Sequence, residues 1–169
     1  MRPAYRWTLA PLLALVMLSA CGDSLVGPPP SGFGTFRGTL DGEAFNGYGW
    51  AVLIGDSVHI FGRRDINTEI GAAEEIRISA LFIGQGSYQI TDAIHGEVER
   101  GSAQFSARAP GQMVVTTYDG TYLVGTISLA LAGSSGWRFE GGNFDLPIFH
   151  SFDDVPVLPG PALPPEPPM

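Results

Sequence analysis

The sequence predicts an all-β domain, an antiparallel β-sandwich or a squat barrel of about 8–10 short strands. Three observations lead to this fold class. Apolar and polar residues alternate with period two in several runs, pairs of glycine and aspartate separate these runs, and no stretch carries a sustained period of 3.6 residues between helix caps. Antiparallel strands joined by tight turns account for all three observations.

The alternating runs mark the expected strands. In residues 74–83, "EEIRISALFI", every second residue from Ile76 is apolar, as in a half-buried strand. Residues 121–131, "TYLVGTISLAL", repeat the pattern from Leu123, and residues 112–118, "QMVVTTY", are rich in the β-branched residues that strands favour. The expected core includes Phe36, Ile60, Ile78, Phe82, Ile127, Leu129, Phe144 and Leu146.

Turn signals lie between these runs. The pairs Asp41-Gly42, Gly55-Asp56 and Asp119-Gly120 each separate two strand-like stretches, and such pairs favour tight hairpin turns with positive φ. The best candidate for a helix, residues 68–75, is short and contains Gly71. We expect at most one helical turn there.

Residues 1–20 have the organisation of a secretory signal peptide. Arg2 and Arg6 precede an apolar run, Leu9–Leu18, and small residues follow it. The run is shorter than the roughly 20 residues of a membrane-spanning helix, and Pro11 interrupts it. A cleaved signal is therefore expected in place of a permanent transmembrane helix.

The end of this signal resembles the lipobox of bacterial lipoproteins. The matching residues are Leu18, Ser19, Ala20 and Cys21. The resemblance implies cleavage before Cys21, a diacylglycerol thioether on its sulfur, and a membrane anchor. Gly22 follows, where aspartate would favour the inner membrane, so the outer membrane of the cell envelope is the expected location. The alternative is an ordinary signal peptide with an incidental cysteine, which leaves an exported protein with one unpaired thiol.

Proline-rich stretches flank the expected β-domain, residues 32–152. Residues 21–31 form a lipidated N-terminus and a tether that contains three consecutive prolines. Residues 153–169 contain seven prolines, a density that no helix or central strand tolerates. We expect a disordered tail there; a second interpretation is a proline-rich ligand for a groove in a partner.

The β-domain is similar to an uncharacterised family of small bacterial lipoprotein domains. Its pattern has an opening hairpin with an aromatic residue, a Gly-x-Gly-x-Tyr turn, a Gly-Thr-hydrophobic strand and a closing Gly-x-Phe-x-hydrophobic-Pro. The matching residues are Asp41, Gly42 and Phe45; Gly84, Gly86 and Tyr88; Gly125, Thr126 and Ile127; and Gly142, Phe144, Leu146 and Pro147. Ser87 falls between Gly86 and Tyr88, and Ile127 stands where many members have phenylalanine. The resemblance implies a sandwich-like domain on a lipid anchor and supplies no catalytic residue.

Charge argues against a nucleic-acid partner. The chain has 17 acidic and 9 basic residues, and cleavage before Cys21 removes Arg2 and Arg6, leaving a side-chain charge of 7 − 17 = −10. Phosphate binding needs a positive face. An envelope protein or a glycan is the more plausible partner, besides the membrane itself.

Few residues suggest chemistry. On a strand, His95, Glu97 and Glu99 would lie on one face, where an imidazole and two carboxylates could hold a divalent ion. The favoured interpretation is a polar, solvent-facing edge strand, and no metal or cofactor is expected. His59, between Val58 and Ile60, is expected on the solvent side. Trp50, Trp137 and Tyr122 could form an aromatic platform for a sugar or peptide, although such residues are usually core.

The sequence contains no nucleophile elbow, no His-Glu-x-x-His and no phosphate loop. It therefore predicts a membrane-anchored lipoprotein with a non-catalytic binding or structural module, and not an enzyme. The alternatives are a small β-barrel carrier of an apolar ligand and a metal-assisted enzyme using His95, Glu97 and Glu99.

Overall fold

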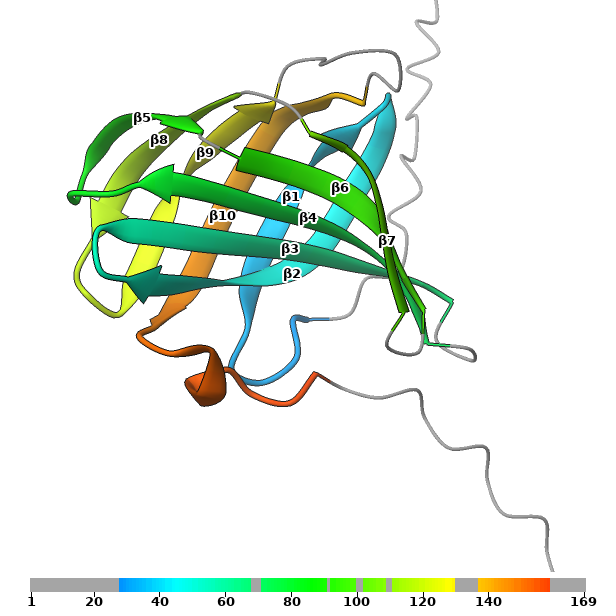
Figure 1. Ribbon diagram of the computed structural model, residues 1–169, viewed down its shortest axis with the longest axis horizontal. Helices are drawn as coiled ribbons and strands as arrows, with labels where there is room; N and C mark the ends of the chain where they lie inside the picture. Colours follow the sequence, from blue (N-terminus) through cyan, green and yellow to red (C-terminus); the bar gives the residue numbers. More distant parts are fainter. Residues whose placement is uncertain are drawn as a thin grey trace, which may run out of the picture.

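A computed structural model describes residues 28–67, 71–90, 92–99, 102–108, 111–129 and 137–158. In these ranges, ten strands form one sheet that curls around a core (Figure 1). The all-β prediction is confirmed, and the single curled sheet is closer to the barrel than to the sandwich. The elements are β1 (Gly34–Leu40), β2 (Glu43–Ile54), β3 (Ser57–Asn67), β4 (Ala72–Leu81), β5 (Gly86–Ile90), β6 (Asp92–Glu99), β7 (Ser102–Arg108), β8 (Gly111–Tyr118), β9 (Tyr122–Leu129), β10 (Phe139–Phe149) and a 3₁₀ turn, η1 (Phe152–Asp154).

The strand order explains the curl. The order is β5-β8-β9-β10-β1-β2-β3-β4-β6-β7, so β5 occupies one edge while β4, which precedes it in the chain, lies near the other edge. Residues 82–85 connect the two strands, and a four-residue link spans at most about 14 Å. The sheet must therefore bend until its β5 edge comes close to β4.

The predicted turns have the expected backbone conformation. Asp41 and Gly42 both have positive φ, 50° and 88°, and Gly55 and Gly120 have φ of 58° and 90°. The Asp119 carboxylate accepts hydrogen bonds from the backbone N–H groups of Thr121 and Tyr122, which closes the β8–β9 turn. In residues 68–75, the described part shows no helical turn, since residues 72–75 belong to β4.

One neighbouring pair departs from the antiparallel pattern. β1 lies between β10 and β2 and is antiparallel to both. Beyond the start of β1 at Gly34, β10 meets β2 directly and pairs with it in parallel, Ile148 with Ala51 and Phe149 with Val52. This pairing holds the end of β10 beside the middle of β2.

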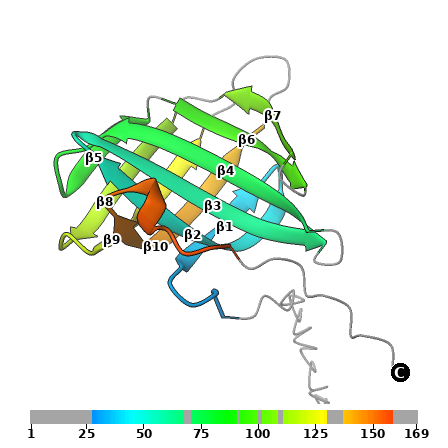
Figure 2. The same ribbon diagram turned by 60° about the horizontal axis from the view of Figure 1, so that its bottom comes forward.

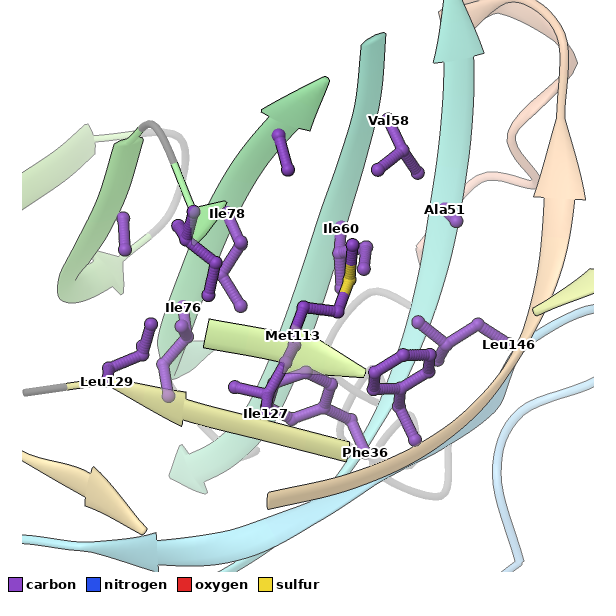
Figure 3. Packing of buried hydrophobic residues seen from close by; sticks show 14 of the residues in the cluster. Phe36, Ala51, Val58, Ile60, Ile76, Ile78, Met113, Ile127, Leu129 and Leu146 are labelled. Carbon is purple, nitrogen blue, oxygen red and sulfur yellow. The ribbon is translucent and has the colours of Figure 1, made fainter. Parts of the chain in front are cut away.

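The inner face of the curl is filled by apolar side chains from strands on all sides (Figure 3). All eight core residues expected from the sequence are buried. The Phe36 ring stacks on Phe139 at 5.3 Å and meets Phe45 edge-on at 5.8 Å. Gly62 is required opposite this ring, because a Cβ there would come within 2.3 Å of a Phe36 ring carbon.

A second apolar cluster lies on the outer face, and we call it the outer cluster. It consists of the buried residues Tyr48, Trp50 and Val52, and of Phe33, Phe61, Phe149, Val155 and Leu158 packed against them. Figure 2 shows the C-terminal segment lying over this side of the sheet. The sequence placed the end of the β-domain at residue 152, but residues up to Leu158 pack on it. Residues 1–27, including Cys21, and 159–169 lie outside the described residues.

Candidate functional site

Alternate residues of β2, β3, β4 and β6 face outward and form two cross-strand rows. The strand registers bring Trp50, Phe61, Arg77 and Ile94 into one row, and Val52, His59, Ser79 and Asp92 into the next. The first row carries the aromatic residues and the second carries most of the polar ones. A surface with one apolar and one polar stripe results.

These rows line a groove of about 520 Å³, which the C-terminal segment borders through Phe152 and Val155. The volume lies within the range typical of small-molecule sites, roughly 300–1,000 Å³. Apolar side chains with a few polar groups are also the usual lining of such sites. The groove is therefore the best candidate for a functional site among the described residues.

Aromatic rings form one side of the groove. Trp50 and Phe61 stack with centroids 5.0 Å apart and planes 6° from parallel. Phe152, on η1, meets Phe61 edge-on at 6.0 Å and lies 5.9 Å from the His59 ring. Trp50 is buried, whereas Phe152 is 51% exposed. Phe152 therefore offers apolar surface at the entrance.

Polar groups from both rows line the rest of the groove. The His59 Nδ1 and the Ser79 Oγ are 2.9 Å apart and share a hydrogen bond. Arg77 forms an ion pair with the almost buried Glu75, and its guanidinium lies 5.8 Å from the centre of the Phe61 ring. The Arg77 side chain keeps 43% of its surface exposed. A ligand in the groove can thus meet a cation, a hydroxyl and an imidazole beside the apolar wall.

The order of the polar row differs from that of an activated nucleophile. A serine and a histidine within hydrogen-bond reach resemble an activated nucleophile. In such sites, however, a carboxylate orients the histidine, whereas here Ser79 stands between His59 and Asp92. Asp92 lies two strands from His59, about 10 Å away at the usual strand spacing. At that distance Asp92 is not placed to hold the imidazole as the carboxylate of such sites does.

His59 occupies the position expected from the sequence, on the outer face between the buried Val58 and Ile60. The three aromatic residues considered as a platform do not come together. Trp50 belongs to the outer cluster, Trp137 to the inner core, and Tyr122 is half exposed at the start of β9. Only Trp50 contributes to the groove.

The residues that sequence reasoning missed are Phe61, Arg77, Ser79, Asp92 and Phe152. Phe61 lies two residues from His59 on the expected strand, so the sequence could have placed it on the same outer face. The other four depend on how β4, β6 and η1 align with β3.

Of the metal candidates, His95 lies on the inner face, where it packs near the buried Trp137 ring. The His95 Nε2 is 2.8 Å from the Glu74 Oε1, a carboxylate partner that the sequence did not reveal. Glu97 is exposed, and the Glu99 side chain lies outside the described residues. In the described part of the chain, no three histidine, cysteine or acidic side chains group closely enough to hold a metal ion.

Glu74 sits at the centre of a small polar network inside the curl. Besides His95, it binds Arg64 through the Nη2 and, at 3.0 Å, the Nε of the guanidinium. Burial, the largest single cause, raises the pKa of Glu74, but the hydrogen bonds from His95 and Arg64 and the electrostatic attraction to them together outweigh it and hold the pKa below its ordinary value. The guanidinium also lies 5.1 Å from the centre of the buried Phe45 ring. The network therefore joins β3, β4 and β6 beside the core.

Across the described ranges, we find no helix with the length and apolar character needed to cross a membrane. No family model, curated protein or solved structure matches the chain. The groove is therefore interpreted from its own geometry.

Proposed function

We propose that this chain is a lipid-anchored protein of the bacterial cell envelope and that its β-domain is a non-catalytic binding module. The observation that carries the proposal is the outer groove of about 520 Å³, with its aromatic side and its polar row. A site of this composition suits a ligand with an apolar body and a few polar groups. The anchor, which would hold the module at the outer membrane, rests on the lipobox-like residues Leu18–Cys21 and on the signal that precedes them.

Two features support placing the ligand in the outer groove and not inside the curl. The inner face is filled by a contiguous cluster of buried side chains, which leaves the carrier alternative without a supporting observation. His95, the histidine of the enzyme alternative, is already bonded to Glu74. The groove, by contrast, opens to solvent beside the half-exposed Phe152.

The anchor is tested on the mature protein, expressed in a bacterium that processes lipoproteins. We expect an N-terminal Cys21 carrying two or three acyl chains, because the signal ends in a lipobox-like motif. Intact-mass and peptide mass spectrometry read the modification directly. A Cys21→Ser variant should lose the acyl mass and leave the membrane fraction; an unmodified thiol on the wild-type N-terminus would exclude the anchor.

The groove is tested by titrating indole and phenol into the isotope-labelled mature chain carrying Cys21→Ser. We expect NMR shift changes concentrated on the Trp50 indole N–H and on residues of the two rows. Phe152→Ala, which removes one wall, should weaken binding about tenfold, or about 1.4 kcal/mol. The matched control is Val114→Ala, which alters an exposed apolar residue on β8, away from the groove.

Shift changes confined to core residues such as Met113 would instead support the carrier. Changes scattered over the surface, with equal affinity in Phe152→Ala, would contradict the binding module.

A further inference from the structure

The outer face already holds a proline-containing stretch of its own chain. Val155 and Leu158 pack on the outer cluster, and Pro156 lies against Gly32 so closely that a Cβ on Gly32 would be 2.9 Å from the Pro156 Cγ. Val155 has φ −68° and ψ 127°, close to polyproline II. Val155 and Leu158, three residues apart, both pack on the outer cluster while Val157 is 95% exposed, which is the spacing of that helix. The sheet thus accommodates an extended chain of apolar residues and proline.

The groove continues this surface. Trp50, Phe61 and Val155 belong both to the outer cluster and to the groove lining. Beyond them, the groove extends over β4 and β6 to Ile94 and Asp92, where none of the described C-terminal residues, 150–158, is part of the lining. Aromatic-lined grooves of this kind are the usual receptors for polyproline II segments, because such segments are already extended and lose little entropy on binding.

We propose that the groove binds an extended proline-rich peptide, and that its occupant is residues 159–169 of a second copy of this chain. This inference rests on the proposed function and specifies its ligand. The segment reads "PGPALPPEPPM" and contains six prolines. Its Leu163-Pro164 repeats Leu158-Pro159, whose leucine packs on the outer cluster. As polyproline II, its eleven residues would reach about 34 Å, more than the roughly 15 Å across β3, β4 and β6.

Charge is consistent with this occupant. Glu166 is the one ionisable side chain of the segment. Arg77 is the arginine that the described residues contribute to the groove lining, and it keeps a large part of its side chain exposed although it also pairs with Glu75. A carboxylate that reaches the exposed side of Arg77 adds a charge-assisted hydrogen bond. The prolines and Leu163 would then lie along the aromatic side.

The path of the chain favours a second copy over the same one. Phe152 lies over β3, and the chain then returns toward the start of β1, where Pro156 contacts Gly32 and Leu158 joins Phe33 in the outer cluster. The sheet order is β1-β2-β3-β4-β6 in this region. The described chain therefore ends on the outer cluster over β2 and β3, whereas Ile94 and Asp92 of the open groove lie on β6.

The experiment compares the full mature chain with a form that ends at Leu158, both carrying Cys21→Ser. In sedimentation velocity, the full chain should associate as its concentration rises, and the shortened form should not, because it lacks the occupant. A synthetic peptide of residues 158–169 should bind the shortened form and shift the Trp50 indole N–H. Phe152→Ala in the protein, or Leu163→Ser in the peptide, should weaken binding about tenfold, and Glu166→Gln several-fold. Val114→Ala should have no effect.

The outcomes separate this inference from the proposed function. If indole and phenol perturb the groove but the peptide does not bind, the occupant is wrong and the binding module stands. If neither binds, both fail. Association that persists without residues 159–169 would place the contact between copies elsewhere and overturn the proposal. A monomeric full chain whose groove resists the peptide, while the shortened form accepts it, would show that each chain occupies its own groove.

Discussion

Replacing Phe36 by alanine is expected to lower the free energy of unfolding by about 3–5 kcal/mol. The side chain is 1% exposed, and it stacks on Phe139 and contacts Phe45 edge-on. Alanine removes these contacts and leaves a cavity, which the surrounding strands can close only in part because β1 is paired on both sides. Urea unfolding followed by tryptophan fluorescence measures the loss.

The control for this change is Val114→Ala, on the outer face of β8 and 37% exposed. Exposed substitutions usually alter stability by less than about 0.5 kcal/mol, so a small effect is expected. Equal losses in the two variants would mean that Phe36 is not part of a packed core. A changed dependence on urea concentration would instead indicate an altered denatured state.

Replacing Arg64 by alanine is expected to cost about 2–3 kcal/mol, because it removes the guanidinium that pairs with the largely buried Glu74 carboxylate and leaves His95 as the hydrogen-bond partner among the described residues. The cost stays below that of a fully buried pair because the Arg64 and Glu74 side chains are 24% and 13% exposed. The matched control is Arg138→Ala, which breaks an exposed pair with Glu140 and should cost less than about 1 kcal/mol. Similar losses in both variants would contradict a stabilising role for the inner network.

The pH dependence of stability provides a second test of the Glu74 network. The folded-state pKa of Glu74 is lower than its ordinary value of 4.5, so its stabilising contribution is present above that value. This contribution is lost as the pH falls through the lowered pKa. Arg64→Ala removes one cause of the lowering, so the loss should begin at a higher pH than in the wild type. Glu74→Gln should remove this contribution altogether, and an unchanged acid limb in both variants would exclude Glu74 as its source.

Local pattern was sufficient to predict the strands and much of the core. The alternation around Ile76 and Leu123 identifies β4 and β9, because a strand buried on one face must repeat every two residues. The pairing order was not predictable. β5 follows β4 in the chain but forms one edge of the sheet, seven positions from β4 in the strand order, and only the folding of the whole sheet determines that arrangement.

The groove, too, could be predicted only in part, because its lining depends on strand pairing. His59 could be placed on the outer face, but Ser79 and Asp92 join its row only through the registers of β4 and β6. The C-terminal wall was missed for a different reason. A high proline content argues correctly against strand and helix there, but it does not argue against packing. Val155 and Leu158, three residues apart, carried a signal with the period of polyproline II.

The central position of β1 determines how the domain would respond to force. If the N-terminal segment is fixed to a membrane, any pull on the domain enters through Phe33 and Gly34, at the start of β1. That strand has seven residue pairs with β2 and five with β10, and Pro156 lies against Gly32 just before it. Two ladders and the C-terminal packing must therefore yield before the first strand can be extracted. A strand at either edge of the sheet would be peeled from a single neighbour, so an attachment through the start of β1 would load the domain at a mechanically strong point.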